Sequence, residues 1–230
     1  MKALAIITAR GGSKRIPRKN IKPFLGKPII EYSIDAAISS GMFSEVMVST
    51  DDQEIVDIST KAGATVPFMR SEKTANDYAT TLDVLLEVIE EYESRGKHFD
   101  YMCCLYPTAP FVTADAISEA MNILIDKQAD TVFPVVKFSF PPQRCMIVKD
   151  GRLEAKWPEY TQTRSQDLEP YYHDCGQFYC INVNSLLEQR KIMMEKVLPF
   201  YQDEINVQDI DTLEDWQIAE MKYKILKGLS

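Results

Sequence analysis

The feature that most constrains the fold is a regular alternation of short apolar runs with longer amphipathic segments. Runs such as Ala3–Ile7 and Tyr101–Leu105 are almost free of polar residues, which is typical of strands buried on both faces of a parallel sheet. Within Thr80–Glu93, apolar side chains recur at helical spacing from Leu82 to Ile89 and form one stripe. This alternation predicts a three-layer α/β/α sandwich with a mostly parallel sheet, in which ligands bind at the carboxyl ends of the strands.

The same patterns predict the position of each element. We expect strands at residues Ala3–Ile7, Glu45–Ser49, Thr65–Phe68, Tyr101–Leu105, Thr131–Val136, Phe178–Val183 and Glu204–Val207. We expect helices at residues Ile30–Ser40, Glu54–Ala62, Thr80–Glu93, Ala114–Lys127, Ser185–Met194 and Leu213–Lys227.

The loop after the first expected strand is strongly basic. The first thirty residues carry eight Lys or Arg and no Asp or Glu, whereas the whole protein has a formal net charge of −8. The turn Gly11–Ser13 can bring backbone N–H groups together around phosphate oxygens, and the Arg and Lys side chains can neutralise the phosphate charge. Neither G-x-x-x-x-G-K-[ST] nor G-x-G-x-x-G is present, which excludes a P-loop and a dinucleotide fingerprint. We expect a site for a small polyanion; a solvated turn is the alternative.

Composition excludes several other classes of protein. Five cysteines without C-x-x-C spacing and only two histidines argue against a disulfide framework or a zinc site, and they favour a reducing cytosol. The acidic balance argues against nucleic-acid or membrane-surface binding, and no apolar run approaches the length of a membrane span. With 230 residues, 45% of them apolar, the chain is expected to form a single cytoplasmic domain over residues 1–230.

Residues 137–172 interrupt the alternation. This stretch holds four prolines and a turn at Asp150–Gly151, which predict a β-rich excursion with a hairpin at that turn. Its many aromatic residues, Trp157 and Tyr171 among them, favour packing against another subunit. An ordinary surface loop is the alternative.

Two acidic residues near the end of the chain predict a metal site. Asp209 and Asp211 are two residues apart, so a strand would place both carboxylates on one face. Two close carboxylates repel each other, and Mg²⁺ shared with phosphate oxygens would relieve that repulsion. The alternative is that Asp211 or Thr212 caps the last helix, with Asp215 completing a capping box.

Other expected strands are also followed by polar residues. Thr50 or Asp51 is placed to cap the second helix. Arg70 follows a strand and would take a phosphate or a base carbonyl, while Asp77 would cap the next helix. Thr108 lies between two prolines that hold its turn stiff.

The segment Ala9–Asn20, ARGGSKRIPRKN, with its continuation through Pro28, resembles the signature of the CMP-sialic acid synthetase family, the acylneuraminate cytidylyltransferases. The resemblance extends from Ala5 to Trp216. Tyr106 stands where that family usually has Gln, and Thr8 stands where it usually has Pro. The sequences of residues 71–79 and 167–179 are most similar to those of the pseudaminic acid cytidylyltransferases.

The resemblance implies a Rossmann-like nucleotidyltransferase that transfers CMP from CTP to the anomeric hydroxyl of a nonulosonic acid and releases pyrophosphate. Pseudaminic acid is the expected acceptor; N-acetylneuraminate, legionaminate and Kdo are the alternatives, and an inactive nucleotide-binding protein is an alternative of another class. The resemblance also implies a homodimer in which residues 137–172 approach the partner's active site. No side chain is identified as the general base.

The resemblance assigns site residues by role. The catalytic residues are Arg10, Lys19 and Asp211; the nucleotide-binding residues are Ala9, Arg10, Gly11, Gly12, Ser13, Lys14, Lys19, Asn20, Arg70, Asp77 and Thr108; the sugar-binding residues are Tyr106, Arg164, Gln177 and Tyr179; and the Mg²⁺ ligands are Asp209 and Asp211.

Overall fold

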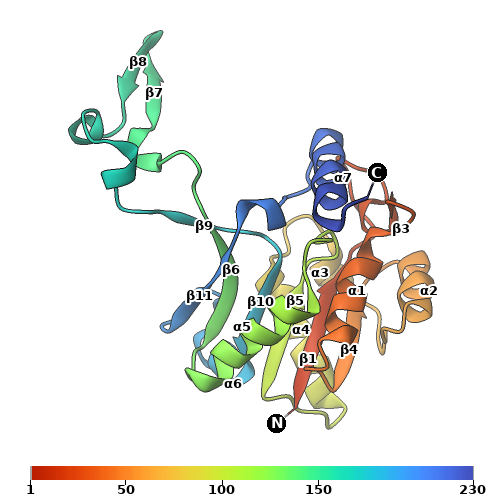
Figure 1. Cartoon of the computed structure of the whole chain (residues 1–230). Coiled ribbons are helices and arrows are strands. Elements are labelled where there is room, and N and C mark those ends of the chain that lie inside the picture. The colour runs from red at the N-terminus through yellow and green to blue at the C-terminus, as the bar shows by residue number, and fades with distance from the viewer. Residues whose placement is uncertain (1, 230) are drawn as a thin grey trace.

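The structure is a computed structural model that describes residues 2–229. A mixed seven-stranded sheet lies between two layers of helices (Figure 1). Its strands are β1 (Ala3–Thr8), β4 (Glu45–Ser49), β5 (Tyr101–Leu105), β6 (Thr131–Lys137), β9 (Tyr172–Asp174), β10 (Phe178–Asn182) and β11 (Val197–Gln202). Two small hairpins pair β2 (Pro23–Phe24) with β3 (Lys27–Pro28), and β7 (Met146–Lys149) with β8 (Arg152–Ala155). The α-helices are α1 (Ile29–Ser39), α2 (Gln53–Lys61), α3 (Glu72–Ala75), α4 (Thr81–Ser94), α5 (Ala114–Asp126), α6 (Val183–Gln189) and α7 (Leu213–Lys227).

The sheet has the order β11-β6-β10-β5-β1-β4, and β9 pairs with the last residues of β6. β1 runs parallel to both β4 and β5, and β11 runs parallel to β6. β10 is antiparallel to both of its neighbours, β5 and β6. The expected α/β fold with a mostly parallel sheet is therefore confirmed.

The core explains why the strands read as unbroken apolar runs. In β1, Ala3, Ala5 and Ile7 pack on one side with residues of α1, α2 and α5, while Leu4 and Ile6 pack on the other side with α4 and α6. All five side chains are buried. Because helices cover both faces of the sheet, neither face of the strand needs polar residues.

Two predicted strands are wrong. Thr65 forms only an isolated bridge with Met47, and the chain does not continue as a strand because Pro67 has no N–H to donate to a ladder. Residues Glu204–Asn206 form a 3₁₀ helix, η5, and the strand lies earlier, at β11. β11 contains Pro199, and it tolerates this residue because it is at the edge of the sheet.

The expected helix Ser185–Met194 is also shorter than predicted. It forms α6, which ends at Gln189 because Arg190 adopts a left-handed conformation with φ 46°. No helix within residues 2–229 is both long and apolar enough to cross a membrane.

Residues 138–171 form an arm that leaves the sheet at the end of β6 and returns at β9. The β7–β8 hairpin at its tip stands away from the rest of the molecule (Figure 1). Asp150 and Gly151 both have positive φ, 49° and 73°, as a two-residue hairpin turn requires. The predicted hairpin at these two residues is confirmed.

Candidate active site

The register of the sheet brings several predicted loops to one edge. Thr8 is level with Ser49, and Leu105 is level with both Ile7 and Phe178. The loops after β1, β4 and β5 therefore begin side by side, and β10, which runs the other way, begins at the same edge. The segment of residues 207–211 reaches the same place from the end of η5.

These loops enclose a cavity of about 530 Å³. Nine of the residues assigned to the site line it: Arg10, Ser13, Lys14, Lys19, Asn20, Tyr106, Thr108, Asp209 and Asp211. Five further lining residues were not assigned to the site: Thr8, Arg15, Ile16, Pro107 and Gly176. Arg15 belongs to the basic cluster from which the anion site was predicted. Its charge could therefore have identified it, although the resemblance did not assign it to the site.

Asp77 joins two of the basic residues. Its carboxylate accepts a hydrogen bond from Arg10 Nη1 at 2.7 Å and pairs with the ammonium of Lys14. These contacts with Lys14 and then Arg10 lower the pKa of Asp77 below its usual value. The prediction that Asp77 caps α4 is wrong, because Thr80 is the N-cap and forms a capping box with Asp83.

The acidic pair faces the basic loop. Arg15 Nη2 lies 2.9 Å from Asp211 Oδ1, and Lys19 Nζ lies 2.7 Å from the carbonyl oxygen of Ile210 and 3.4 Å from Asp211 Oδ1. Burial, followed by the nearby charge of Asp211, raises the pKa of Asp209 above its usual value. Two carboxylates therefore repel each other at the wall of the cavity.

The backbone around these acids differs from the prediction. Residues 207–211 are an irregular segment outside any strand, and they connect η5 to the start of α7. Thr212, not Asp211, is the N-cap of α7, and it forms the expected capping box with Asp215. Asp215 Oδ2 also accepts the backbone N–H of Asp211 at 3.1 Å, which fixes the segment that carries the acidic pair to the start of the helix.

The donor set at this wall fits a magnesium ion. Among residues 2–229 no group of three or more His, Cys, Asp or Glu side chains is placed to hold a metal. Mg²⁺ does not require one, because it commonly takes one or two carboxylates together with phosphate oxygens and water. Asp209 and Asp211 meet that requirement beside a cavity lined with cations.

Gly11 faces away from the cavity, toward the start of α2. Its N–H donates to Asp51 Oδ1 at 2.9 Å, and a Cβ on Gly11 would lie 2.7 Å from Asp52 Oδ2. The N-cap of α2 is Asp52, not the predicted Thr50 or Asp51, and its carboxylate also pairs with Arg18. The loop thus needs glycine at position 11 for close packing.

The other expected backbone contacts lie partly outside the cavity. Ala9 is buried and its N–H donates to the carbonyl of Ser49 at 3.0 Å. Gly12 is not among the lining residues. Asn20 is both lining and structural, because its Nδ2 donates to the carbonyl oxygen of Arg10 at 2.8 Å.

Arg70 is buried at the end of β4. Its guanidinium donates to Ser49 Oγ at 3.0 Å and to the Ser49 carbonyl oxygen at 2.6 Å, and burial lowers its pKa to about 10. Arg70 does not line the cavity. Its contacts hold the end of β4 beside the site, and its assignment to the nucleotide stays a prediction.

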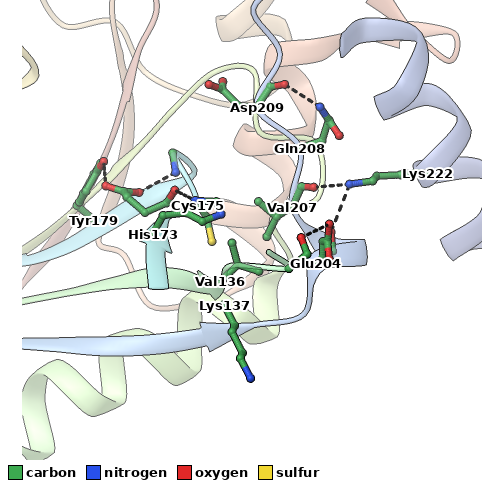
Figure 2. Close-up of a pocket in the computed structure, with 13 residues that line it drawn as sticks. Val136, Lys137, His173, Cys175, Tyr179, Glu204, Val207, Gln208, Asp209 and Lys222 are labelled. Atoms are coloured by element: carbon green, nitrogen blue, oxygen red, sulfur yellow. Dashed lines mark hydrogen bonds between the residues drawn. The ribbon is translucent and has the colours of Figure 1, made fainter. Parts of the chain in front are cut away.

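A second cavity, of about 500 Å³, adjoins the first and shares Gly176 and Asp209 with it. Figure 2 shows Tyr179 on one side of this second cavity and Lys222 of α7 on the other. The Tyr179 hydroxyl donates to Asp174 at 2.5 Å, and burial together with Asp174 raises the pKa of Tyr179.

The remaining sugar-binding assignments are placed differently. Gln177 is buried and its Nε2 donates to the carbonyl oxygen of Asn206 at 2.7 Å. Tyr106 lines the first cavity and its hydroxyl lies 2.9 Å from Thr81 Oγ1. Arg164 lies on the arm, where it pairs with Asp167 at 2.6 Å, and it lines neither cavity.

Comparisons with known proteins agree with this geometry. A family model described as cytidylyltransferase matches residues 4–173. The chain is 41% identical over 226 residues to pseudaminic acid cytidylyltransferase of Campylobacter jejuni serotype O:2, covering 98% of this chain and 97% of that protein. It is 33% identical to CMP-N,N'-diacetyllegionaminic acid synthase of Legionella pneumophila, covering 96% of this chain and 95% of that protein. A solved CMP-2-keto-3-deoxy-manno-octonic acid synthetase in complex with CTP shares the fold, with a TM-score of 0.70, 19% identity and full coverage of both chains.

Proposed function

The chain belongs to the cytidylyltransferase family, and we propose that it transfers CMP from CTP to the anomeric hydroxyl of pseudaminic acid, with release of pyrophosphate. The chain aligns along nearly its whole length with proteins named for CMP transfer to nonulosonic acids. The observation that carries the proposal is one cavity that the basic loop and the acidic pair line together, with Asp211 in contact with Arg15 and Lys19. The cations of the loop can neutralise a triphosphate directly, and the two carboxylates could do so through a bound Mg²⁺.

In this proposal the first cavity takes CTP. Arg10, Lys14 and Lys19 neutralise the β- and γ-phosphates as negative charge grows on the leaving pyrophosphate. The N–H of Ser13 is used within the loop, where it donates to the Gly11 carbonyl oxygen at 3.0 Å, so the Ser13 hydroxyl is the group left for the phosphates. The side chains act mainly by positioning and charge compensation.

The second cavity takes the acceptor sugar. It meets the first cavity at Gly176 and Asp209, so a sugar bound there presents its anomeric hydroxyl toward the nucleotide across their common wall. Tyr179 lies on the sugar side and Tyr106 on the nucleotide side, with ring centroids 5.9 Å apart. These two rings form a boundary between the two substrates.

Asp209 and Asp211 would hold Mg²⁺. When bound, the ion neutralises phosphate charge and lowers the pKa of a coordinated hydroxyl. Asp211 is held in position for the ion, because Lys19 and Arg15 contact its carboxylate and the Asp215 carboxylate accepts its backbone N–H.

The arm would complete the site in a homodimer. Its exposed apolar residues include Phe140, Val148 and Leu153, which are 88%, 74% and 70% exposed in the single chain. Covering such a surface with a second copy removes it from water. In that assembly Arg164 would approach the partner's acceptor, where its guanidinium suits a sugar carboxylate. A cytoplasmic location, as the free thiols suggest, would give both substrates access.

The experiment is pyrophosphate release from CTP with pseudaminic acid, N,N'-diacetyllegionaminic acid, N-acetylneuraminic acid and Kdo as separate acceptors. We expect release with pseudaminic acid in the presence of Mg²⁺ and its loss when EDTA is added. Turnover with another acid alone would replace the acceptor and keep the reaction. No turnover with any acid, together with undetectable CTP binding by calorimetry, would reject the proposed function.

A further inference from the structure

We propose that Lys222 binds the carboxylate of the acceptor acid; this inference rests on the proposed function and adds a residue that the sequence did not assign. Lys222 lies on α7, is partly buried, and lines the second cavity together with Asp209. Figure 2 shows its ammonium directed toward the segment that carries Asp209.

The contacts of Lys222 leave its charge uncompensated. Nζ donates to the carbonyl oxygen of Val207 at 2.9 Å and of Glu204 at 3.4 Å. Both acceptors are neutral, and among the ion pairs formed within residues 2–229 none involves Lys222. An ammonium group has three N–H donors, so one remains for a ligand. A partly buried cation that contacts only carbonyl oxygens binds an anion strongly, because the anion supplies the charge that the cation lacks.

The position of Lys222 matches the chemistry of the acceptor. In a nonulosonic acid the carboxylate and the anomeric hydroxyl are attached to one carbon atom, so the groups that receive them must lie close together. Val207, which holds the ammonium, and Asp209, at the wall shared with the nucleotide cavity, are two residues apart in the chain, so their Cα atoms are at most about 7 Å apart. A carboxylate at Lys222 therefore directs the hydroxyl toward Asp209 and the nucleotide.

Lys222 is the cation of the second cavity best placed to bind the carboxylate, because the acids that line this cavity repel an anion and the other lysine points away. Asp174 is engaged by the Tyr179 hydroxyl and the Gly176 N–H, and Glu204 accepts from Ser139 Oγ at 3.2 Å. Both acids repel a carboxylate. Lys137 is exposed, and Figure 2 shows its side chain pointing away from Lys222 and Asp209.

The test compares Lys222→Met with Lys222→Arg, using pseudaminic acid and its methyl ester, or whichever acid the wild type uses. We expect Lys222→Met to raise the KM for the acid about 10- to 100-fold with an unchanged Kd for CTP, and Lys222→Arg to restore part of the loss. The wild type should prefer the acid over the ester, and Lys222→Met should lose most of that preference, the rest being the contribution proposed for Arg164. Lys224→Met is the matched control, because Lys224 lies on the same helix and lines neither cavity.

A purely structural lysine gives a different pattern. If Lys222→Met lowers the melting temperature, weakens the binding of CTP and acid alike, and keeps the full wild-type preference for the acid over the ester, the inference is overturned while the proposed function stands. If Lys222→Met fails to fold, Lys222→Gln takes its place, because its amide can still donate to the Val207 carbonyl oxygen but carries no charge. Wild-type KM values for both acid and ester in that variant overturn the inference equally. A wild type that turns over none of the nonulosonic acids rejects the proposed function and this inference together.

Discussion

At the level of single residues, Asp77 forms ion pairs with two of the cations proposed to bind the nucleotide. Its two carboxylate oxygens each engage one cation, Arg10 and Lys14, much as oxygens of one phosphate group would. In the proposed function, the Asp77 carboxylate is thus a counter-ion that the nucleotide would displace. Asp77 is held in place by the turn that contains it, in which Asn76 Oδ1 accepts hydrogen bonds from the N–H groups of Tyr78 and Ala79 at 2.8 and 3.1 Å.

Removing that counter-ion should tighten nucleotide binding. We expect Asp77→Asn to lower the Kd for CTP about 3- to 10-fold at low ionic strength, because Arg10 and Lys14 no longer exchange one anion for another. Calorimetry without acceptor measures this. Glu72→Gln, on α3 in the same segment, removes one charge that engages neither cation and should leave the Kd unchanged. Weaker binding by Asp77→Asn would instead mean that Asp77 orients the two cations for the phosphates.

A site residue could be predicted where neighbouring residues in the sequence reveal its role. Arg10, Lys14 and Lys19 were found because a basic cluster in an acidic chain is visible in the sequence itself. Arg70 was assigned to the nucleotide from the strand before it and from the resemblance, but neither indicated that its guanidinium contacts Ser49. That contact depends on burial by neighbouring segments, which no local pattern encodes.

At the level of elements, the start of α7 controls the acidic segment. Thr212 and Asp215 form the capping box, and Asp215 also holds the backbone of Asp211. We expect Thr212→Ala to lower the free energy of unfolding by about 1 kcal/mol and the melting temperature by about 2–4 °C. Differential scanning calorimetry checks this, with Thr60→Ala at an exposed position inside α2 as control. Equal melting temperatures for the two variants would mean that the box contributes nothing.

Element positions were predictable where sequence and burial agree. β4, β5 and α7 have the predicted bounds, because their apolar patterns match the faces that the sheet and helices bury. β11 was missed because Pro199 reads as a strand breaker, and only the sheet order shows that it lies at an edge. The acids of residues 207–211 were correctly grouped, although the backbone that groups them is a loop rather than a strand.

At the level of the whole molecule, the arm presents one apolar face. Val148 pairs with Leu153 and Met146 pairs with Ala155 across the β7–β8 hairpin, while Ile147 and Glu154 form a pair on its other face. Successive residues of a strand alternate between faces. The exposed apolar side chains of Met146, Val148 and Leu153 therefore lie together, on the side that we expect a second copy to cover.

This predicts a dimer that a single charge on that face disrupts. Light scattering should give twice the mass of the chain at micromolar concentration, and Leu153→Asp should give a monomer because a buried, unpaired carboxylate is costly. Glu154→Gln, on the opposite face of the hairpin, should remain dimeric. A monomeric wild type, or a dimeric Leu153→Asp, would contradict the role of the arm. The sequence predicted the hairpin from its turn, but how far the arm stands from the sheet depends on the whole chain.

The arm joins the sheet through a single ladder, in which Val135, Val136 and Lys137 of β6 pair with Asp174, His173 and Tyr172 of β9. Insertions and deletions between the two ends of that ladder therefore leave the register of the central strands, and the spacing of the nucleotide-binding loops, unchanged. In the proposed dimer, where the arm contributes to the acceptor site, changes in the arm could therefore alter contacts with the acceptor and leave the CTP-binding loops in place.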